Sequence, residues 1–497
     1  MKRCHWLPLT LLAFAGHAQQ PAPDTVSARW DKTEMISKTT LTLQVVVNPP
    51  LRRGSALHDS IFTALHALGC DYVRYVPWLP YPRLGVAELK PPTRQQTFWD
   101  FSVIDPMTLD FLDATKGHSV ILNFSTIPAW MYRTDVPVTY PDDPYAVFWN
   151  YTQGSIPRDT TYREIADYYA RLYSWYTKGG FTDELGQRHQ SGYHYSIPYW
   201  EVLNEVDFEH GNTAKSYTRL YDAVTAAIKK ESPDTKFVGL ALADPNRPEW
   251  FEYFLNPKNH RGGAPLDMIS YHFYAIGSTG QGADVMQYTF WDRADGFLNA
   301  TRFIESIRKR LSPTTRTTID ELGSILDNDN DVPDRKTPIP DAYWPLSGAL
   351  YAYTWLGLAH MGIDIVGESQ LVGYPTQYPS VSMIDWKNGR PNARYWVLRL
   401  LKENFGPGDR FVESGLSGTD PDAADALTQQ AIVTSKGKRL LLINRRNKAI
   451  RLVLPKEMIG ATWRVVDAST GDEQPVENKI TAAPIELKPF AVAVAGD

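Results

Sequence analysis

The stretch "YWEVLNEVDFEH", residues 199–210, carries an apolar run directly into the pair Asn204–Glu205. A second stretch, "RTTIDELGS", residues 316–324, runs in the same way into Glu321. Two carboxyl groups that face each other can cleave an acetal, because one protonates the departing oxygen while the other attacks or stabilises the carbon. The chemistry available to this chain therefore depends on whether the fold brings Glu205 and Glu321 together.

The elements that must position these residues repeat along the chain. Between about residues 40 and 405, short apolar runs alternate with amphipathic stretches, a pattern typical of parallel strands with crossover helices. Strands are expected at 41–47, 71–76, 119–124, 199–204, 236–242, 267–273, 316–320 and 363–367, and helices at 163–179, 217–232, 347–362 and 393–406, among others. Eight such units predict an α/β fold, a (β/α)8 TIM barrel, whose chemistry lies at the C-terminal ends of its strands. Glu205 follows the fourth predicted strand and Glu321 the seventh, so both should reach the same mouth.

The flanks of the predicted barrel, residues 41–406, differ from it. Residues 1–18 combine a basic start, a short apolar run and small residues before a cleavage point, features typical of an export signal, so we expect a secreted or periplasmic protein. Residues 407–497 contain short alternating strands with turn signals and predict an antiparallel β-sandwich domain. Residues 19–40 form an N-terminal segment that could add an edge strand to it. No later run approaches the roughly 20 apolar residues of a membrane helix.

Composition excludes several classes of function. The net charge of −5 over 497 residues offers no basic surface to a nucleic acid, whereas 15 Trp and 27 Tyr suit the apolar faces of sugars. With the signal removed, Cys70 is the single cysteine and no internal disulfide can form. The sequence contains no zinc spacing, P-loop or dinucleotide fingerprint, so no cofactor is expected. The alternating aspartates of residues 326–334 imitate a calcium loop, but Val332 and Pro338 replace its glycine and its last glutamate, so no metal is expected there.

The chain resembles the clan A glycoside hydrolases, most closely family 39, which contains β-xylosidases and α-L-iduronidases. "WEVLNEVDF" resembles that family's W-E-x-W-N-E-P-[ND] signature, although Leu203 and Val206 replace the second tryptophan and the proline. The resemblance implies that Glu205 is the acid/base and that Asn204 binds the 2-hydroxyl of the sugar. "TTIDELGS" resembles the family's nucleophile strand, which implies that Glu321 is the nucleophile.

Two further motifs carry the resemblance. "DMISYHFYA" resembles the family's sixth strand and implies that His272 and Tyr274 lie beside the site. "DYVRYVPW" has Arg74 where clan members keep an arginine near the nucleophile. An arginine inside an apolar strand also needs a carboxylate partner on physical grounds. The end of the eighth strand departs from many clan members, because "DIVGESQLVGY" provides no aromatic platform for the sugar.

Other candidates for substrate binding rest on position alone. Asn123 ends the third predicted strand and could form a turn or bind a sugar. Trp130, like Trp78 and Tyr81, lies in the long insertions after strands two and three, where stacking on a sugar and ordinary loop packing are both open.

Polar residues at the two remaining strand ends are candidates for specificity. Glu368 and Gln370 follow the eighth predicted strand and could contact the sugar. Arg52 and Arg53 follow the first predicted strand, where they could bind the carboxylate of a uronic acid or form a solvated turn.

These features favour an exported, cofactor-free retaining glycosidase that removes a terminal sugar such as xylose from a plant oligosaccharide. In such an enzyme the acid/base Glu205 needs a raised pKa, and Glu321 must stay ionised beside Arg74. Three alternatives stay open: a uronic-acid-directed enzyme of the iduronidase kind, an endo-acting polysaccharide hydrolase or lyase, and a noncatalytic carbohydrate-binding protein on a decayed barrel. No membrane or nucleic-acid partner is expected.

Overall fold

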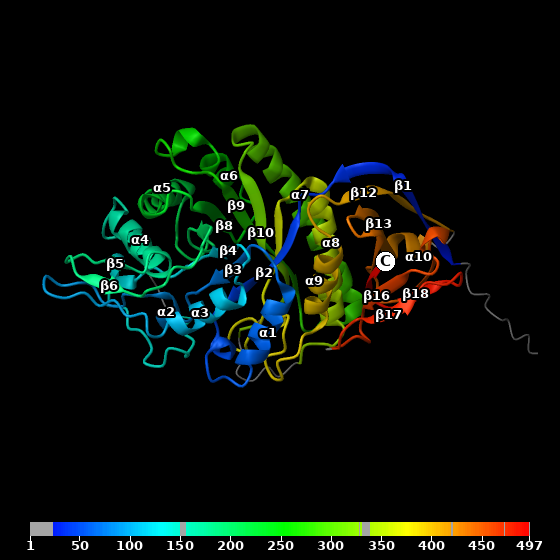
Figure 1. The fold of residues 1–497 in the computed structure, drawn as a ribbon, viewed down its shortest axis with the longest axis horizontal. Coiled ribbons are helices and arrows are strands. Elements are labelled where there is room, and N and C mark those ends of the chain that lie inside the picture. Colours follow the sequence, from blue (N-terminus) through cyan, green and yellow to red (C-terminus); the bar gives the residue numbers. More distant parts are fainter. Residues whose placement is uncertain are drawn as a thin grey trace, which may run out of the picture.

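The structure is a computed structural model and describes residues 23–149, 156–327, 329–330, 338–418, 421–471 and 473–496. A closed eight-stranded barrel is surrounded by helices, and a nine-stranded sheet lies beside it (Figure 1). The predicted export signal at residues 1–18 falls outside the described residues. Within the described part of the chain, no helix is long and apolar enough to cross a membrane.

All eight predicted barrel strands are present, and neighbouring strands pair in parallel to close the barrel. The predicted fold class, a (β/α)8 barrel with a C-terminal β domain, is therefore confirmed. The barrel strands are β2 (Thr40–Val46), β3 (Val73–Val76), β4 (Val120–Leu122), β7 (Tyr199–Glu201), β8 (Lys236–Leu242), β9 (Met268–Gly277), β10 (Arg316–Leu326) and β11 (Ile365–Glu368). A small hairpin, β5 (Gly180–Thr182) and β6 (Arg188–Gln190), stands apart from the barrel.

Helices cover the outside of the barrel (Figure 1). The four that the sequence delimited are α4 (Arg163–Thr177), α5 (Ala214–Glu231), α8 (Tyr343–Met361) and α9 (Ala393–Asn404). The others are α1 (His58–Leu68), α2 (Pro82–Gly85), α3 (Asp105–Ala114), α6 (Pro248–Phe254) and α7 (Ala283–Leu311). Apolar residues recur on one side of the amphipathic helices and bury that side against the strands.

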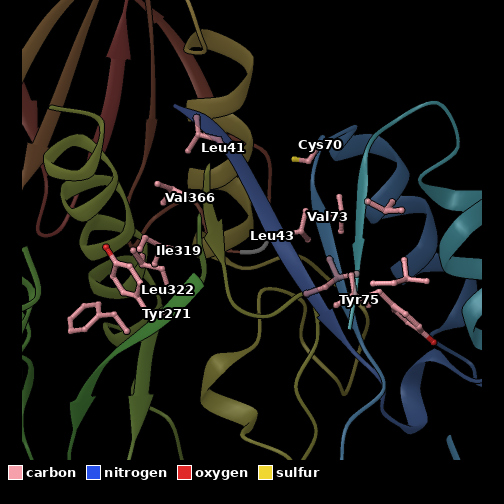
Figure 2. Packing of buried hydrophobic residues seen from close by; sticks show 14 of the residues in the cluster. Leu41, Leu43, Cys70, Val73, Tyr75, Tyr271, Ile319, Leu322 and Val366 are labelled. Carbon is pink, nitrogen blue, oxygen red and sulfur yellow. The ribbon is translucent and has the colours of Figure 1, made fainter. Parts of the chain in front are cut away.

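The two faces of each barrel strand explain both the core and the site. On β2, Leu41, Leu43 and Val45 belong to the main hydrophobic core between strands and helices, where Figure 2 shows Leu41 and Leu43. The alternate residues Gln44 and Val46 line a cavity inside the barrel. Because both faces are buried, the strand reads as a nearly continuous apolar run. One residue from each of five strands forms a separate buried cluster at the other end of the barrel: Ile121, Tyr199, Val238, Met268 and Ile365.

The second body is one nine-stranded sheet with its own hydrophobic core. Its strands follow the order β17-β16-β19-β14-β13-β12-β1-β15-β18. Their bounds are β1 (Asp24–Ile36), β12 (Arg410–Ser417), β13 (Leu427–Thr434), β14 (Gly437–Asn444), β15 (Ile450–Val453), β16 (Thr462–Val466), β17 (Val476–Lys479), β18 (Ile485–Leu487) and β19 (Val492–Ala495), with a short helix α10 (Pro421–Ala426). The N-terminal strand β1 was expected at an edge, but it lies inside the sheet, antiparallel to β12 and parallel to β15.

Candidate active site

The turn that carries Glu205 has an uncommon backbone. The sequence predicted a strand as far as residue 204, but β7 ends at Glu201, and the chain then takes a left-handed φ of 66° at Leu203 and 41° at Glu205. Residues other than glycine rarely adopt such angles, and strain of this kind clusters at functional sites. The carbonyl of Glu205 closes the turn by accepting a hydrogen bond of 2.8 Å from the backbone N–H of Glu209.

Glu321 lies within a strand rather than after it. The predicted strand ended at residue 320, whereas β10 continues to Leu326 and pairs with β9 as far as Gly277. The longer pairing holds the backbone of Glu321 opposite His272. This strand gives Glu321 a rigid support, unlike the turn that carries Glu205.

Both oxygens of Glu321 accept hydrogen bonds from buried donors. Arg74 Nη1 donates to Oε1 at 2.5 Å, and the Tyr274 hydroxyl donates to Oε2 at 2.7 Å. Burial raises the pKa of Tyr274 well above its ordinary value, so its hydroxyl remains a donor. A charge-assisted bond from a guanidinium stabilises an ionised carboxylate, which suits a nucleophile.

His272 lies between the two carboxyl groups. Its Nδ1 is 3.0 Å from Oε1 of Glu205 and 3.5 Å from Oε2 of Glu321. A ligand atom from each of these three residues lies within 4.8 Å of the other two. The fold thus brings together two glutamates that are far apart in the sequence, with carboxyl oxygens close enough to act on the same carbon.

The electrostatic setting differs for the three groups. Burial is the largest cause that raises the pKa of Glu205, and Glu321 adds to it against a hydrogen bond from His272. Burial opposes a charge on His272, but Glu321, Asp320 and Glu205 outweigh it and raise its pKa well above the ordinary value. We therefore treat His272 as an imidazolium and Glu205 as a carboxyl group that holds its proton more strongly than a solvated glutamate.

Arg74 is the centre of the buried network beneath the site. It is fully buried, and its Nε donates to Glu201 at 2.5 Å while Nη2 donates to Asn204 at 2.6 Å. Its Nη1 donates to Gln44 as well as to Glu321. The predicted pairing of Arg74 with a carboxylate is present, but the side chain positions other residues and has no surface open to a substrate.

Two further buried acids, Glu201 and Asp320, form ion pairs with Arg74. Burial raises the pKa of Glu201 to about 7, although Arg74 opposes the shift. Burial would also raise the pKa of Asp320, but Arg74 and His272 hold it below its ordinary value. Ser270 donates to Glu201 at 2.5 Å. These contacts compensate the buried cation, which would otherwise be costly in a low-dielectric interior.

A cavity of about 200 Å³ opens above this network at the C-terminal ends of the strands. Its lining residues are Gln44, Val46, Val76, Trp78, Asn204, Glu205, Tyr274, Ile276, Glu321, Ile325, Gln370, Tyr378 and Val381. Trp78 and Tyr378 stack with centroids 5.9 Å apart, and Trp149 meets both edge-on. The cavity thus combines two carboxyl groups with aromatic and aliphatic walls.

Several predicted residues meet at this cavity. Asn204, Tyr274 and Gln370 line it beside the two glutamates. Asn123 lies behind them, where its Nδ2 donates to Glu201 at 2.7 Å and to the carbonyl of Leu203 at 3.0 Å. Asn123 therefore supports the strained turn and does not line the cavity.

Two other candidates from the long insertion and the eighth strand lie elsewhere. Trp130 is not part of the cavity lining. Its indole N–H donates to the carbonyl of Glu88 at 2.8 Å, and the guanidinium of Arg158 lies over its ring. Glu368 is fully buried and accepts a hydrogen bond of 3.0 Å from Arg394. Burial raises the pKa of Glu368 to about 8. The structure gives both residues packing or positioning contacts in place of the predicted sugar contacts.

The arginine pair after the first strand also lies outside the cavity lining. Arg53 forms an ion pair of 2.8 Å with Asp110, and Arg52 lies 5.0 Å from the centroid of the Tyr145 ring. Tyr81, another insertion residue, is fully buried, whereas its neighbour in sequence Trp78 does line the cavity.

Sequence reasoning missed several residues of the site, including the aliphatic residues of the lining and three polar or aromatic residues, Gln44, Glu209 and Tyr378. Gln44 interrupts the apolar run "LTLQVVV", a signal that was visible. Glu209 lies four residues after Glu205, and it accepts hydrogen bonds from Trp78 at 2.5 Å and Asn204 at 2.9 Å. Tyr378 reaches the cavity from a loop after β11, and no local pattern marks it.

The same three central groups are of the kind that can hold a metal ion. The candidate ligand atoms belong to Glu205, His272 and Glu321. Each is already engaged within the protein, since Glu205 bonds to His272 and both oxygens of Glu321 accept from Arg74 and Tyr274. A nearby guanidinium also opposes the approach of a cation.

Comparisons with known proteins agree on the fold. No family model matches the chain, and no curated protein matches its sequence. A GH30 endoxylanase from Clostridium papyrosolvens C71 is 13% identical, with a TM-score of 0.56 over 95% of this chain and 100% of that one. An α-L-arabinofuranosidase from Thermotoga maritima is 16% identical, with a TM-score of 0.60 over 95% and 99%. A glucosidase from Croceicoccus marinus is 14% identical, with a TM-score of 0.61 over 95% and 98%.

At these identities the likeness establishes a common fold across both bodies of the chain. The similar structures include members of glycoside hydrolase families 30 and 51. The resemblance to the clan A glycoside hydrolases is therefore matched at the level of fold, while membership of family 39 stays a prediction.

Proposed function

We propose that this chain is a retaining glycoside hydrolase in which Glu205 is the acid/base and Glu321 is the nucleophile. The observation that carries the proposal is the placement of the two carboxyl groups, whose oxygens lie within 4.8 Å of each other over one cavity. A separation of about 5 Å suits direct attack on the anomeric carbon, whereas inversion needs a wider gap for a water molecule.

The reaction takes place in two displacements. In the first, Glu205 gives its proton to the glycosidic oxygen, the bond from that oxygen to the anomeric carbon breaks, and Glu321 forms a bond to the same carbon. In the second, Glu205 removes a proton from water, the water oxygen bonds to the anomeric carbon, and the bond to Glu321 breaks. Two inversions retain the configuration of the sugar.

The surrounding contacts suit this exchange of roles. Arg74 and Tyr274 donate to Glu321 before it attacks and when it leaves. Once Glu321 is esterified its negative charge is gone, so the repulsion that helps Glu205 to keep its proton weakens. Glu205 is then free to act as a base in the second displacement.

We also propose removal of a single terminal sugar. A cavity of about 200 Å³ is small beside the roughly 300–1,000 Å³ of pockets that hold drug-sized ligands, so it suits one sugar unit. The resemblance implies a pentose such as xylose. None of the described lining residues is a lysine, arginine or histidine, which disfavours a uronic acid. Export rests on residues 1–18, and N-terminal sequencing of the mature protein should begin at Gln19.

Chemical rescue tests the assignment of Glu321. Glu321→Ala should lower turnover of a dinitrophenyl glycoside by at least about 10³-fold. Azide should restore turnover and give a glycosyl azide of inverted anomeric configuration, because it attacks from the face that the nucleophile vacated. Glu252→Ala, which removes a half-exposed carboxylate on α6, is the matched control and should keep full activity. Undiminished activity of Glu321→Ala would exclude the proposal, and sugar binding by a wild-type protein without hydrolysis would favour the noncatalytic alternative.

A further inference from the structure

The lining of the cavity is polar near its floor and aliphatic towards its mouth. Residues two apart on a strand point to the same side, so inward positions can be followed outward along each strand. On β2, Gln44 near the floor is followed by Val46, and on β3, Arg74 is followed by Val76. The aliphatic side chains of the lining, here called the collar, are Val46, Val76, Ile276, Ile325 and Val381, and they lie along one side of the barrel, on β9, β10, β2, β3 and the loop after β11.

Most polar groups that line the cavity already form hydrogen bonds within the protein. Gln44 accepts from Arg74 and donates to Ser369 at 2.9 Å, which uses both ends of its amide. Asn204 accepts from Arg74 and gives one N–H to Glu209, which leaves its second N–H. The Tyr378 hydroxyl contacts Asn330, and the third lining amide, Gln370, has one long contact of 3.5 Å. These partners suffice for hydroxyls near the anomeric carbon, but the collar provides none.

The collar also provides no positive charge. The two cations beside the floor are already engaged: the three nitrogens of Arg74 bond to Glu201, Glu321, Gln44 and Asn204, and Nδ1 of His272 bonds to Glu205. A carboxylate on the sugar that packs against the collar would therefore have no counter-charge there, and a hydroxymethyl group would have no hydrogen-bond partner from the collar. Both are costly to bury, the carboxylate far more so.

Given the hydrolase function proposed above, on which this inference rests, we propose that the sugar bound in the cavity is a 6-deoxyhexose. Its C5 substituent is a methyl group, which packs against the collar and needs no polar partner. A pentopyranose carries only hydrogen at that carbon and leaves the methyl-sized space without contacts. The expected kcat/KM falls with the C5 substituent in the order methyl, hydrogen, hydroxymethyl, carboxylate. Xylose, which carries hydrogen there, is therefore expected second.

A matched series of nitrophenyl glycosides tests this order on the full-length mature protein. The galacto series is β-galactoside, β-D-fucoside, α-L-arabinopyranoside and β-galacturonide, and the gluco series is β-glucoside, β-quinovoside, β-xyloside and β-glucuronide; only the C5 substituent changes within each. In the preferred series, kcat/KM for the methyl compound should exceed that of the hydroxymethyl compound by about 10–100-fold. It should exceed that of the pentoside by about fourfold. A hexoside, uronide or pentoside that is cleaved faster than its methyl counterpart in the preferred series would overturn the inference.

Two variants on one strand assign the preference to the collar. Val46→Thr places a hydroxyl in the collar at nearly constant volume, and should reduce the methyl-over-hydroxymethyl ratio by about tenfold. Val45→Thr makes the same change on the opposite, core-facing side of β2 and should leave the ratio unchanged. The ratio does not depend on the fraction of folded protein, so a loss of stability cannot imitate the effect. An equal ratio in Val46→Thr and wild type would show that the collar does not discriminate.

The possible outcomes distinguish a failure of the proposed sugar class from a failure of the proposed hydrolase function. Turnover that depends on Glu321 but follows a different order of substituents overturns the sugar class alone. If no glycoside of either series is cleaved in a Glu321-dependent manner, the proposed hydrolase function fails, and the sugar class fails with it.

Discussion

Replacing Glu209 by leucine should weaken the site through Asn204, without touching either proposed catalytic carboxyl group. Glu209 is fully buried beside the cavity, and its Oε1 accepts hydrogen bonds from Trp78 at 2.5 Å and Asn204 at 2.9 Å. Burial, followed by the nearby Glu205, raises the pKa of Glu209 well above its ordinary value. We therefore treat Glu209 as a neutral carboxyl group whose role is that of a hydrogen-bond acceptor.

The size of the effect follows from the bonds that are lost. In Glu209→Leu the side chain keeps nearly the same volume, but two buried N–H groups lose their acceptor. A buried donor without a partner costs about 1–3 kcal/mol, so the loss of the acceptor for two donors should lower the free energy of unfolding by about 2–6 kcal/mol. Asn204 keeps its contact with Arg74 but loses one of its two anchors. A loss of about 1 kcal/mol in the transition state corresponds to roughly fivefold in kcat/KM.

The assay compares two variants on two substrates. Glu209→Gln keeps the acceptor oxygen and should stay within about twofold of wild type, because the group is already neutral. If Asn204 binds the 2-hydroxyl, as the resemblance implies, a 2-deoxy aryl glycoside should be cleaved equally well by wild type and Glu209→Leu. Urea unfolding measures stability separately. A Glu209→Gln variant as poor as Glu209→Leu would refute the neutral acceptor, and an equal loss on the 2-deoxy substrate would refute the route through Asn204.

Three other perturbations test different parts of the structure. Arg74→Met should lower kcat/KM by at least about 10²-fold and the free energy of unfolding by about 3–5 kcal/mol, measured by kinetics and urea unfolding, because it leaves buried carboxylates without their cation. Glu88→Gln should stabilise the protein at pH 7–8 by a few kcal/mol and have little effect near pH 4. Burial raises the pKa of Glu88 to about 8. Between about pH 4.5 and pH 8 this group is ionised in the unfolded chain but protonated in the folded one, so the wild type loses stability as pH rises through that range. Equal melting temperatures of variant and wild type at pH 8 would contradict this. His272→Gln should move the alkaline limb of the kcat/KM profile to higher pH, because the imidazolium opposes the raised pKa of Glu205; a limb that moves down would exclude Glu205 as its origin.

The barrel could be predicted because its strands carry a strong local signal. In "LTLQVVV", residues 41–47, every residue is buried, and the sequence contains eight predicted strands of this kind with helical stretches between them. Glu205 and Glu321 were found because both stand at or near the C-terminal ends of such runs. The uncommon backbone at Leu203 was not predictable, since leucine has no preference for a left-handed φ.

Contacts between distant segments explain what sequence reasoning missed. Glu368 has the position of a sugar ligand, but the structure pairs it with Arg394 on α9, which no local pattern indicates. Trp130 has the residue type of a stacking platform, yet its indole N–H bonds to the carbonyl of Glu88. Residue type and strand position locate the layer of the barrel in which chemistry occurs. Which side chains face the cavity depends on pairings of high sequence separation.

The distribution of cations supports the two proposed catalytic roles without reference to any family. A cationic contact favours the ionised form of a buried carboxyl group, and a neighbouring carboxylate favours the protonated form. Glu321 bonds to Arg74 at 2.5 Å, and Asp320 lies 3.4 Å from Arg74 and 3.4 Å from His272. Among the cations of the described residues, His272 is the one with an ion pair to Glu205, at 3.0 Å. Glu205 is thus the member of the pair that is suited to deliver a proton, and Glu321 the member that is suited to attack.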